Sequence, residues 1–192
     1  IIATVVVGYE AYKFFGPKDE VETTCEEKEI EINSEEDFEQ IKNCRDTITK
    51  AIINIEEIAP NVFEYCSNLK EVDLHGVKSI GNNAFVSCLK LTTVKNTSDV
   101  QNIGKFAFCN CVALKEIDLP NASEIKIGAF FNCKSLNKIS LPSVKLILND
   151  VFTNCSSLEN VTLPKNSKNL EEIISSQKSK NENSGEINFI YK

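Results

Sequence analysis

Six of the eight cysteines in this chain recur at almost constant intervals. The steps between them are 22, 22, 23, 22 and 22 residues, and the cysteines are Cys44, Cys66, Cys88, Cys111, Cys133 and Cys155. Phenylalanine, leucine and isoleucine recur in the same register through five consecutive units, as at Phe63 and Phe85 or at Leu69 and Leu91. A shared period in four residue types indicates a tandem repeat, and this period limits the folds open to the chain.

Each unit contains three apolar patterns that predict three local structures. The last two apolar residues of a unit, such as Val72 and Leu74, are two positions apart and therefore lie on one face of a strand. The leading isoleucine, such as Ile58, begins a second short extended segment on the far side of the coil. Between them, the three-residue spacing of A-F-x-x-C-x-x-L predicts a single helical turn with phenylalanine, cysteine and leucine pointing inward. One unit cannot bury these side chains alone, so the units must stack into a solenoid with a continuous core.

The repeat also has a recognisable form. A period of 20 to 29 residues with L-x-x-[IV]-x-L is the leucine-rich repeat signature. The fuller pattern, best seen in residues 81–88 and 107–111, resembles the BspA-like (Treponema-type) leucine-rich repeats over residues 57–164. The resemblance implies an α/β solenoid of about five coils of 22–23 residues with caps at both ends. The sequence departs from the family pattern at its glycine and alanine positions, which are occupied by Lys126, Leu148, Val62 and Val151.

We divide the chain into four segments: a hydrophobic segment 1–18, an N-terminal cap 19–56, the repeats 57–164 and a C-terminal cap 165–192. The N-terminal cap combines an alternating strand at 29–32, a capping-box pattern at 34–37 that opens a helix, and a buried strand at 51–55. The helix carries Phe38 and Ile41 on one side.

The C-terminal cap begins where the period stops, after Pro164. Asn169 is expected to cap a helix that carries Leu170, Ile173 and Ile174. A polar loop at 175–186 follows, and the alternating Ile187, Phe189 and Tyr191 predict a closing strand over the last coil. The one extra residue between Cys88 and Cys111 predicts an irregular loop at 96–102.

The first residues, Ile1 to Phe15, form an apolar and aromatic run that is too short to cross a bilayer, which needs about 20 residues. Three interpretations stay open. The run is the end of a membrane anchor that begins upstream, with Lys13 and Lys18 favouring the cytoplasmic or matrix side. Otherwise it is an arm that docks on a partner or the remnant of a targeting segment. A membrane contact through Ile1 to Phe15 is therefore one expectation.

Composition excludes several classes of function. A net charge of -7 disfavours a protein that tracks nucleic-acid phosphates. A single histidine, His75, excludes sites that need two imidazoles, and no phosphate-binding glycine motif occurs. The carboxylate pairs Glu71/Asp73 and Glu116/Asp118 lie on an open strand face, where no cleft raises the pKa of one partner for acid–base catalysis. We therefore expect no enzymatic activity, no cofactor and no metal.

The cysteines themselves are expected to be buried core residues. Neighbours one coil apart project in parallel, which is unsuitable geometry for disulfides. Cys109-Asn110-Cys111 resembles a metal or redox pair, but the chain offers it no second pair and no nearby histidine.

Function is then expected on the surface. Solenoids bind partners on extended faces, so we predict that another protein binds to the exposed strand residues. These are Glu71, Asp73, Thr93, Lys95, Glu116, Asp118, Lys138, Ser140, Asn160 and Thr162. The family resemblance implies a membrane-associated protein used in adhesion or recognition at the cell surface. The alternative is a scaffold subunit inside a larger membrane or organellar complex.

Overall fold

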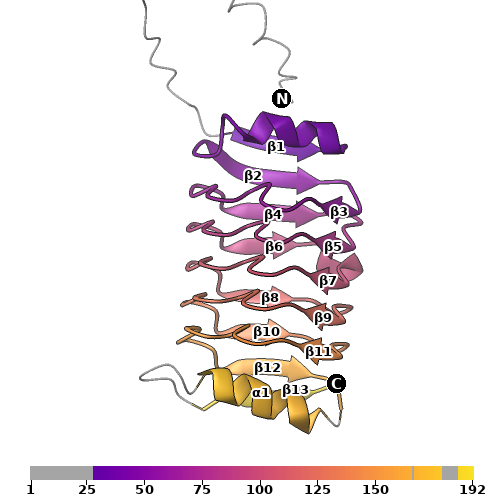
Figure 1. Ribbon diagram of the computed structural model, residues 1–192, viewed down its shortest axis with the longest axis vertical. Coiled ribbons are helices and arrows are strands. Elements are labelled where there is room, and N and C mark those ends of the chain that lie inside the picture. The colour runs from indigo at the N-terminus through magenta and orange to yellow at the C-terminus, as the bar shows by residue number, and fades with distance from the viewer. Residues whose placement is uncertain (1–27, 166, 179–185) are drawn as a thin grey trace, which may run out of the picture.

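The computed structural model describes residues 28–165, 167–178 and 186–192. The chain winds through successive coils that stack along one axis, with the N-terminal part at one end and the C-terminal part at the other (Figure 1). The solenoid predicted from the repeat is therefore confirmed. The apolar run Ile1 to Phe15 and Cys25 lie outside the described residues.

All strand pairs are parallel, and the strands form a front side and a back side. The front side carries two sheets of four strands each. The first contains β1 (Lys28–Ile32), β2 (Ile48–Ile53), β4 (Glu71–Leu74) and β6 (Thr93–Lys95). The second contains β8 (Glu116–Asp118), β10 (Lys138–Ser140), β12 (Asn160–Leu163) and β13 (Asn188–Tyr191).

The back side is one sheet of five two-residue strands, each of which ends at the leading isoleucine of a unit. They are β3 (Glu57–Ile58), β5 (Ser79–Ile80), β7 (Asn102–Ile103), β9 (Glu124–Ile125) and β11 (Leu146–Ile147). We number the coils one to five from these back strands. The residues between each back strand and the next front strand form a third side, the turn side (59–70, 81–92, 104–115, 126–137 and 148–159).

The turn side does not contain the predicted helical turn. In coil one the chain makes successive tight turns instead, with the Cys66 N–H donating to the Phe63 carbonyl at 3.1 Å and the Leu69 N–H donating to the Cys66 carbonyl at 3.0 Å. Asn61 and Tyr65 have left-handed φ angles of 62° and 61°. Because the chain reverses direction at these residues, alternate backbone N–H groups point along the solenoid axis toward the next coil. The Phe63 N–H, for example, donates to the Ala84 carbonyl of the next coil at 2.8 Å. The turns thereby add a third backbone ladder, which a helix would lack.

The core is built from identical residues in register. The rings of Phe63, Phe85, Phe108, Phe130 and Phe152 are fully buried and stack with centroids 5.1 to 5.9 Å apart. Each stacked pair gains aromatic contact energy beyond its area burial. The in-register cysteines of coils one to five, the leucines and the leading isoleucines fill the remaining space, all at most 3% exposed. The predicted core register is therefore confirmed.

The extra residue of coil two splits the front side. It is accommodated in a 3-10 turn, η3 (Thr97–Asp99), that follows β6. The β6 and β8 strands do not pair, and the Thr97 hydroxyl bonds the Asp118 carbonyl across the junction. On the back side β5, β7 and β9 pair without interruption. The predicted irregularity at 96–102 is thus a break confined to the front.

In the described part of the N-terminal cap, β1 leads into a 3-10 helix, η2 (Glu35–Ile41), at the end of the stack (Figure 1). The Asp37 carboxylate accepts bonds from the Asn33 and Ser34 backbone N–H groups, at 2.8 and 3.0 Å, so it closes the predicted capping box. Ile41 is buried, as predicted. The buried strand ends at Ile53 rather than at residue 55.

The C-terminal cap contains one α-helix, α1 (Lys168–Lys178). The helix begins before Asn169, so Asn169 lies in its first turn and the prediction that it caps the helix is wrong. The helix buries Leu170 and Ile174 and half-buries Ile173, and it includes the first four residues of the predicted loop 175–186. The closing strand β13 pairs with β12, as predicted. Within the described residues no helix is long and apolar enough to span a bilayer.

Candidate partner-binding surface

The front strands place the predicted binding residues in two rows that run along the solenoid. The parallel register puts Glu71 beside Thr93 and, in the second sheet, Lys138 between Glu116 and Asn160. It also puts Asp73 beside Lys95 and Ser140 between Asp118 and Thr162. Since β6 and β8 do not pair, the ten predicted residues form two clusters, one on each sheet.

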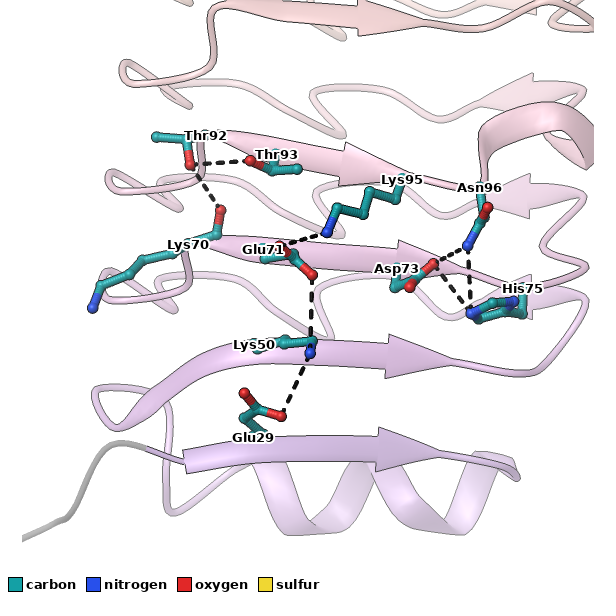
Figure 2. A network of polar contacts seen from close by, with 10 residues as sticks. All are labelled: Glu29, Lys50, Lys70, Glu71, Asp73, His75, Thr92, Thr93, Lys95 and Asn96. Carbon is teal, nitrogen blue, oxygen red and sulfur yellow. Dashed lines mark hydrogen bonds and ion pairs between the residues drawn. The ribbon is translucent and has the colours of Figure 1, made fainter. Parts of the chain in front are cut away.

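Charges alternate across the first sheet, as Figure 2 shows. The Lys50 ammonium lies 3.5 Å from Glu29 and 4.0 Å from Glu71. The other Glu71 oxygen lies 2.9 Å from Lys95. Because the Glu71 side chain is only 27% exposed, its charge is held between two lysines more firmly than an open surface pair. The cluster forms a flat, fixed pattern of opposite charges.

A second group of polar side chains lies at the carboxyl ends of β4 and β6 (Figure 2). Nε2 of His75 is 3.2 Å from the Asp73 carboxylate. The Asn96 amide donates to the same carboxylate and lies 3.5 Å from the His75 ring (Figure 2). His75 is half exposed, so it adds an aromatic, titratable group to the edge of the surface.

The charged side chains of the second sheet form weaker ion pairs than those of the first. The Lys138 ammonium reaches Glu116 only at 4.0 Å, and Glu116 is 71% exposed. Asn188 of β13 donates to Asn160 at 3.2 Å. The Glu116, Asp118 and Lys138 side chains are therefore the ones most available to a partner.

Two of the predicted residues are not exposed. Ser140 is 9% exposed and Thr162 is 5% exposed, so neither offers its side chain to a partner. Both have short side chains and lie side by side on neighbouring strands. Asp118 is the other neighbour of Ser140, and Ile190 is the other neighbour of Thr162. Strand alternation predicts which face a residue occupies, but it does not predict shielding by longer neighbours.

The same surface extends onto the caps, which the prediction omitted. Glu29 on β1 and Lys50 on β2 continue the first cluster, while Asn188 and Ile190 on β13 continue the second. The alternating E-I-E-I at 29–32 was the available signal, because alternation beside a repeat indicates a strand in the same sheet.

The in-register cysteines of coils one to five lie in the core rather than on the surface. All seven cysteines that the structure describes are free thiols. Burial raises the pKa of the Cys66 thiol to about 12, and it raises the pKa values of Cys88, Cys111 and Cys133 well above the ordinary thiol value. Thiols that stay protonated are poor nucleophiles and poor metal ligands.

A parallel stack of coils with an L-x-x-[IV]-x-L strand on one side and a stacked phenylalanine column inside defines a leucine-rich repeat solenoid. The model of the BspA type leucine rich repeat region matches residues 12–111 and 78–188, with six copies. The chain belongs to this family, whose members are in general non-catalytic binding modules.

Solved structures agree with this assignment. The leucine-rich repeat protein of Treponema pallidum has 30% identity and a TM-score of 0.57, over 60% of this chain and 58% of that one. A leucine-rich repeat protein from Bacteroides ovatus has 26% identity and a TM-score of 0.60, over 85% and 42%. A leucine rich cell surface protein from Faecalibacterium prausnitzii has 29% identity and a TM-score of 0.59, over 66% and 34%. This chain thus spans between about a third and three fifths of those chains. No curated protein sequence matches it significantly.

Proposed function

We propose that this protein is a non-catalytic binding module that recognises another protein through its front side and acts in adhesion or recognition at the cell surface. The observation that carries the proposal is the exposed, weakly paired cluster of Glu116, Asp118 and Lys138 on β8 and β10. Charged side chains that lack close ion pairs within the protein can bind another protein without first breaking such a pair. The first cluster, around Glu71, adds a fixed charge pattern that favours specificity.

The location at the cell surface rests on likeness. The F. prausnitzii protein is described as a leucine rich cell surface protein. The apolar run Ile1 to Phe15 is proposed as the membrane contact, within the segment 1–18 that precedes the N-terminal cap 19–56. The caps and the repeats 57–164 together form the binding module, closed by the C-terminal cap 165–192.

A second candidate is a scaffold subunit of an intracellular or organellar membrane complex. Seven free thiols favour it, because extracellular proteins more often oxidise their cysteines. Complete burial of the in-register thiols weakens this argument, since a buried thiol is protected in either compartment.

The location is tested by protease digestion of intact source cells, with the peptides read by mass spectrometry. The cell-surface proposal predicts release of peptides from residues 57–164 without permeabilisation. Protection until the membrane is opened would favour the scaffold, and cross-linking would then identify its neighbours.

The binding surface is tested by charge reversal. The variant Glu116→Lys/Asp118→Lys should abolish binding of the soluble partner, because it inverts two exposed charges of the front side. Both side chains are exposed, so the fold should be retained. The matched control is Glu56→Lys/Glu57→Lys, which makes the same charge change beside the back strand β3. Unchanged binding in the first variant, or equal loss in the control, would refute the assignment.

A further inference from the structure

The turn side of coils two to four is positively charged, whereas the chain as a whole is acidic. The chain has 28 acidic and 21 basic residues, yet the stretches 81–92, 104–115 and 126–137 contain no aspartate or glutamate. They contain five lysines: Lys90, Lys105, Lys115, Lys126 and Lys134. We call this surface the basic turn surface. Among the residues that the structure describes, the ammonium groups of Lys105, Lys126 and Lys134 have no ion-pair partner.

Apolar side chains lie between these lysines. Val86, Cys109 and Phe131 are neighbours on successive coils, because the Ser87 N–H bonds the Cys109 carbonyl at 2.8 Å and the Asn110 N–H bonds the Phe131 carbonyl at 2.9 Å. Leu89 and Phe106 stand out further, at 45% and 39% exposed. We call these apolar side chains, which share the turn side with the five lysines, the apolar strip.

Phe106 also occupies a costly conformation. Its φ is 54°, in the left-handed region that bulky residues avoid. Asn61 and Asn83 occupy the equivalent position in the two preceding coils, with φ of 62° and 56°. Asparagine tolerates this conformation, whereas an aromatic residue there is strained and exposed. Strain of this kind is typically kept where it serves a function.

Neighbouring residues are adapted to this phenylalanine. A Cβ atom on Gly128 would lie 2.2 Å from Cε1 of the Phe106 ring, so the absence of a side chain at Gly128 leaves the space that the ring occupies. The strip is also rigid, because Asn132 donates to Asn110 at 2.7 Å and Asn110 donates to Ser87 at 3.3 Å along its length. A rigid surface binds without a large ordering cost.

We propose that the basic turn surface is a second interaction site, and that its partner is a protein segment carrying both acidic and apolar side chains. Charge complementarity selects the acidic residues, and Leu89, Phe106 and Phe131 select the apolar ones. An anionic bilayer fits less well, because interfacial binding requires apolar side chains to reach about 5–10 Å below the headgroups. In this strip Val86 and Phe131 are half-buried and Cys109 is only 9% exposed. The site is separate from the front-side surface proposed above, so either can fail without the other.

The test uses the full chain and a fluorescent synthetic peptide in which glutamate alternates with phenylalanine and leucine. Binding is followed by anisotropy at low and physiological salt. The peptide should bind, its affinity should fall as salt rises, and Lys105→Glu/Lys126→Glu/Lys134→Glu should weaken it by about tenfold or more. The matched control, Lys78→Glu/Lys145→Glu/Lys165→Glu, makes the same charge change away from the surface and should leave affinity unchanged.

A second variant separates binding from folding. Phe106→Asn introduces the residue that the two preceding coils carry at this position, so the protein should unfold at an equal or higher temperature. Its affinity for the peptide should nevertheless fall severalfold. The proposal is overturned if the peptide does not bind, if both triple variants weaken it equally, or if Phe106→Asn binds normally. Charge-dependent binding to phosphatidylserine vesicles without binding to the peptide would also overturn it in favour of a membrane site.

Discussion

The thiol of Cys111 donates a hydrogen bond to the Phe85 carbonyl of the preceding coil, with the sulfur 3.2 Å from the oxygen. The same contact recurs one coil on, where Cys133 donates to Phe108 at 3.1 Å. The Phe85 carbonyl also accepts the Cys88 N–H at 3.2 Å, and the Cys88 and Cys155 thiols make the same contact to the Phe63 and Phe130 carbonyls. The cysteines of coils two to five therefore each link the inner turns of two coils. Cysteine therefore recurs because its side chain is small enough for the core and because its thiol donates a hydrogen bond to the preceding coil.

This relationship predicts the effect of removing a thiol. Cys111→Ala should lower the free energy of unfolding by about 1–2 kcal/mol, because it removes a buried donor and leaves a small void. Cys44→Ala is the control, since Cys44 is only half-buried and should cost less than about 0.5 kcal/mol. Urea unfolding measures both values, and equal losses would show that the inter-coil contact contributes nothing.

Buried thiols also predict a loss of stability in alkali. Unfolded thiols have a pKa of about 8.5, and burial raises the pKa values of Cys66, Cys88, Cys111 and Cys133. Their contribution is complete below the unfolded pKa and is lost as the pH rises toward the folded pKa values. Each thiol should lower the free energy of unfolding by about 1.4 kcal/mol per pH unit in that window.

Urea unfolding measured between pH 8 and about 10.5 checks this slope. The Cys111→Ala variant should show a slope shallower by about 1.4 kcal/mol per pH unit, because one titrating thiol is missing while every lysine and tyrosine is retained. Identical slopes in the two proteins would contradict the assignment of alkaline unfolding to the core thiols.

Accessibility of the thiols gives an independent prediction. Among the cysteines that the structure describes, an alkylating reagent should modify the half-buried Cys44 of the native protein first and leave the fully buried ones unmodified. After denaturation without reductant, most of the eight cysteines should react. Mass spectrometry counts the adducts, and a largely blocked denatured protein would show that the cysteines are oxidised.

Phe106 and Gly128 are predicted to be energetically coupled. Phe106→Asn should stabilise the protein by about 1 kcal/mol, because it relieves left-handed strain. Gly128→Ala should destabilise it by about 1–3 kcal/mol, because the new methyl group meets the Phe106 ring and Gly128 itself has a φ of 63°. In the double variant the ring is gone, so the loss should shrink. Simple additivity in this double-mutant cycle would refute the contact.

The repeat predicted the core well because burial follows directly from periodic spacing. Phe85, Cys88 and Leu91 are all fully buried, as their register required. The turn conformation was missed because three-residue spacing fits both a helical turn and successive β-turns. The asparagines at positions such as 61 and 83 were the overlooked signal, since asparagine favours the left-handed region.

The candidate surface could be predicted only in part. Alternation placed Glu116 and Asp118 on the front side, and both are exposed. It could not show that Ser140 and Thr162 are shielded, because shielding depends on the size of neighbours on other strands. One extra residue indicated an irregular loop, but it could not show that β6 and β8 separate, since that depends on how η3 fits the coil.

The central claim is that this protein binds a partner through its front side, and site-specific photo-cross-linking in source cells tests it most directly. A photoreactive amino acid is placed in turn at Glu116 and Lys138 on the front, and at Lys145 and Gln101, beside the back strands, as controls. The account predicts a discrete cross-linked partner from the front positions, which disappears in the Asp118→Lys background, and none from the back positions. Equal cross-linking from front and back, or no cross-link from the front positions, would contradict it.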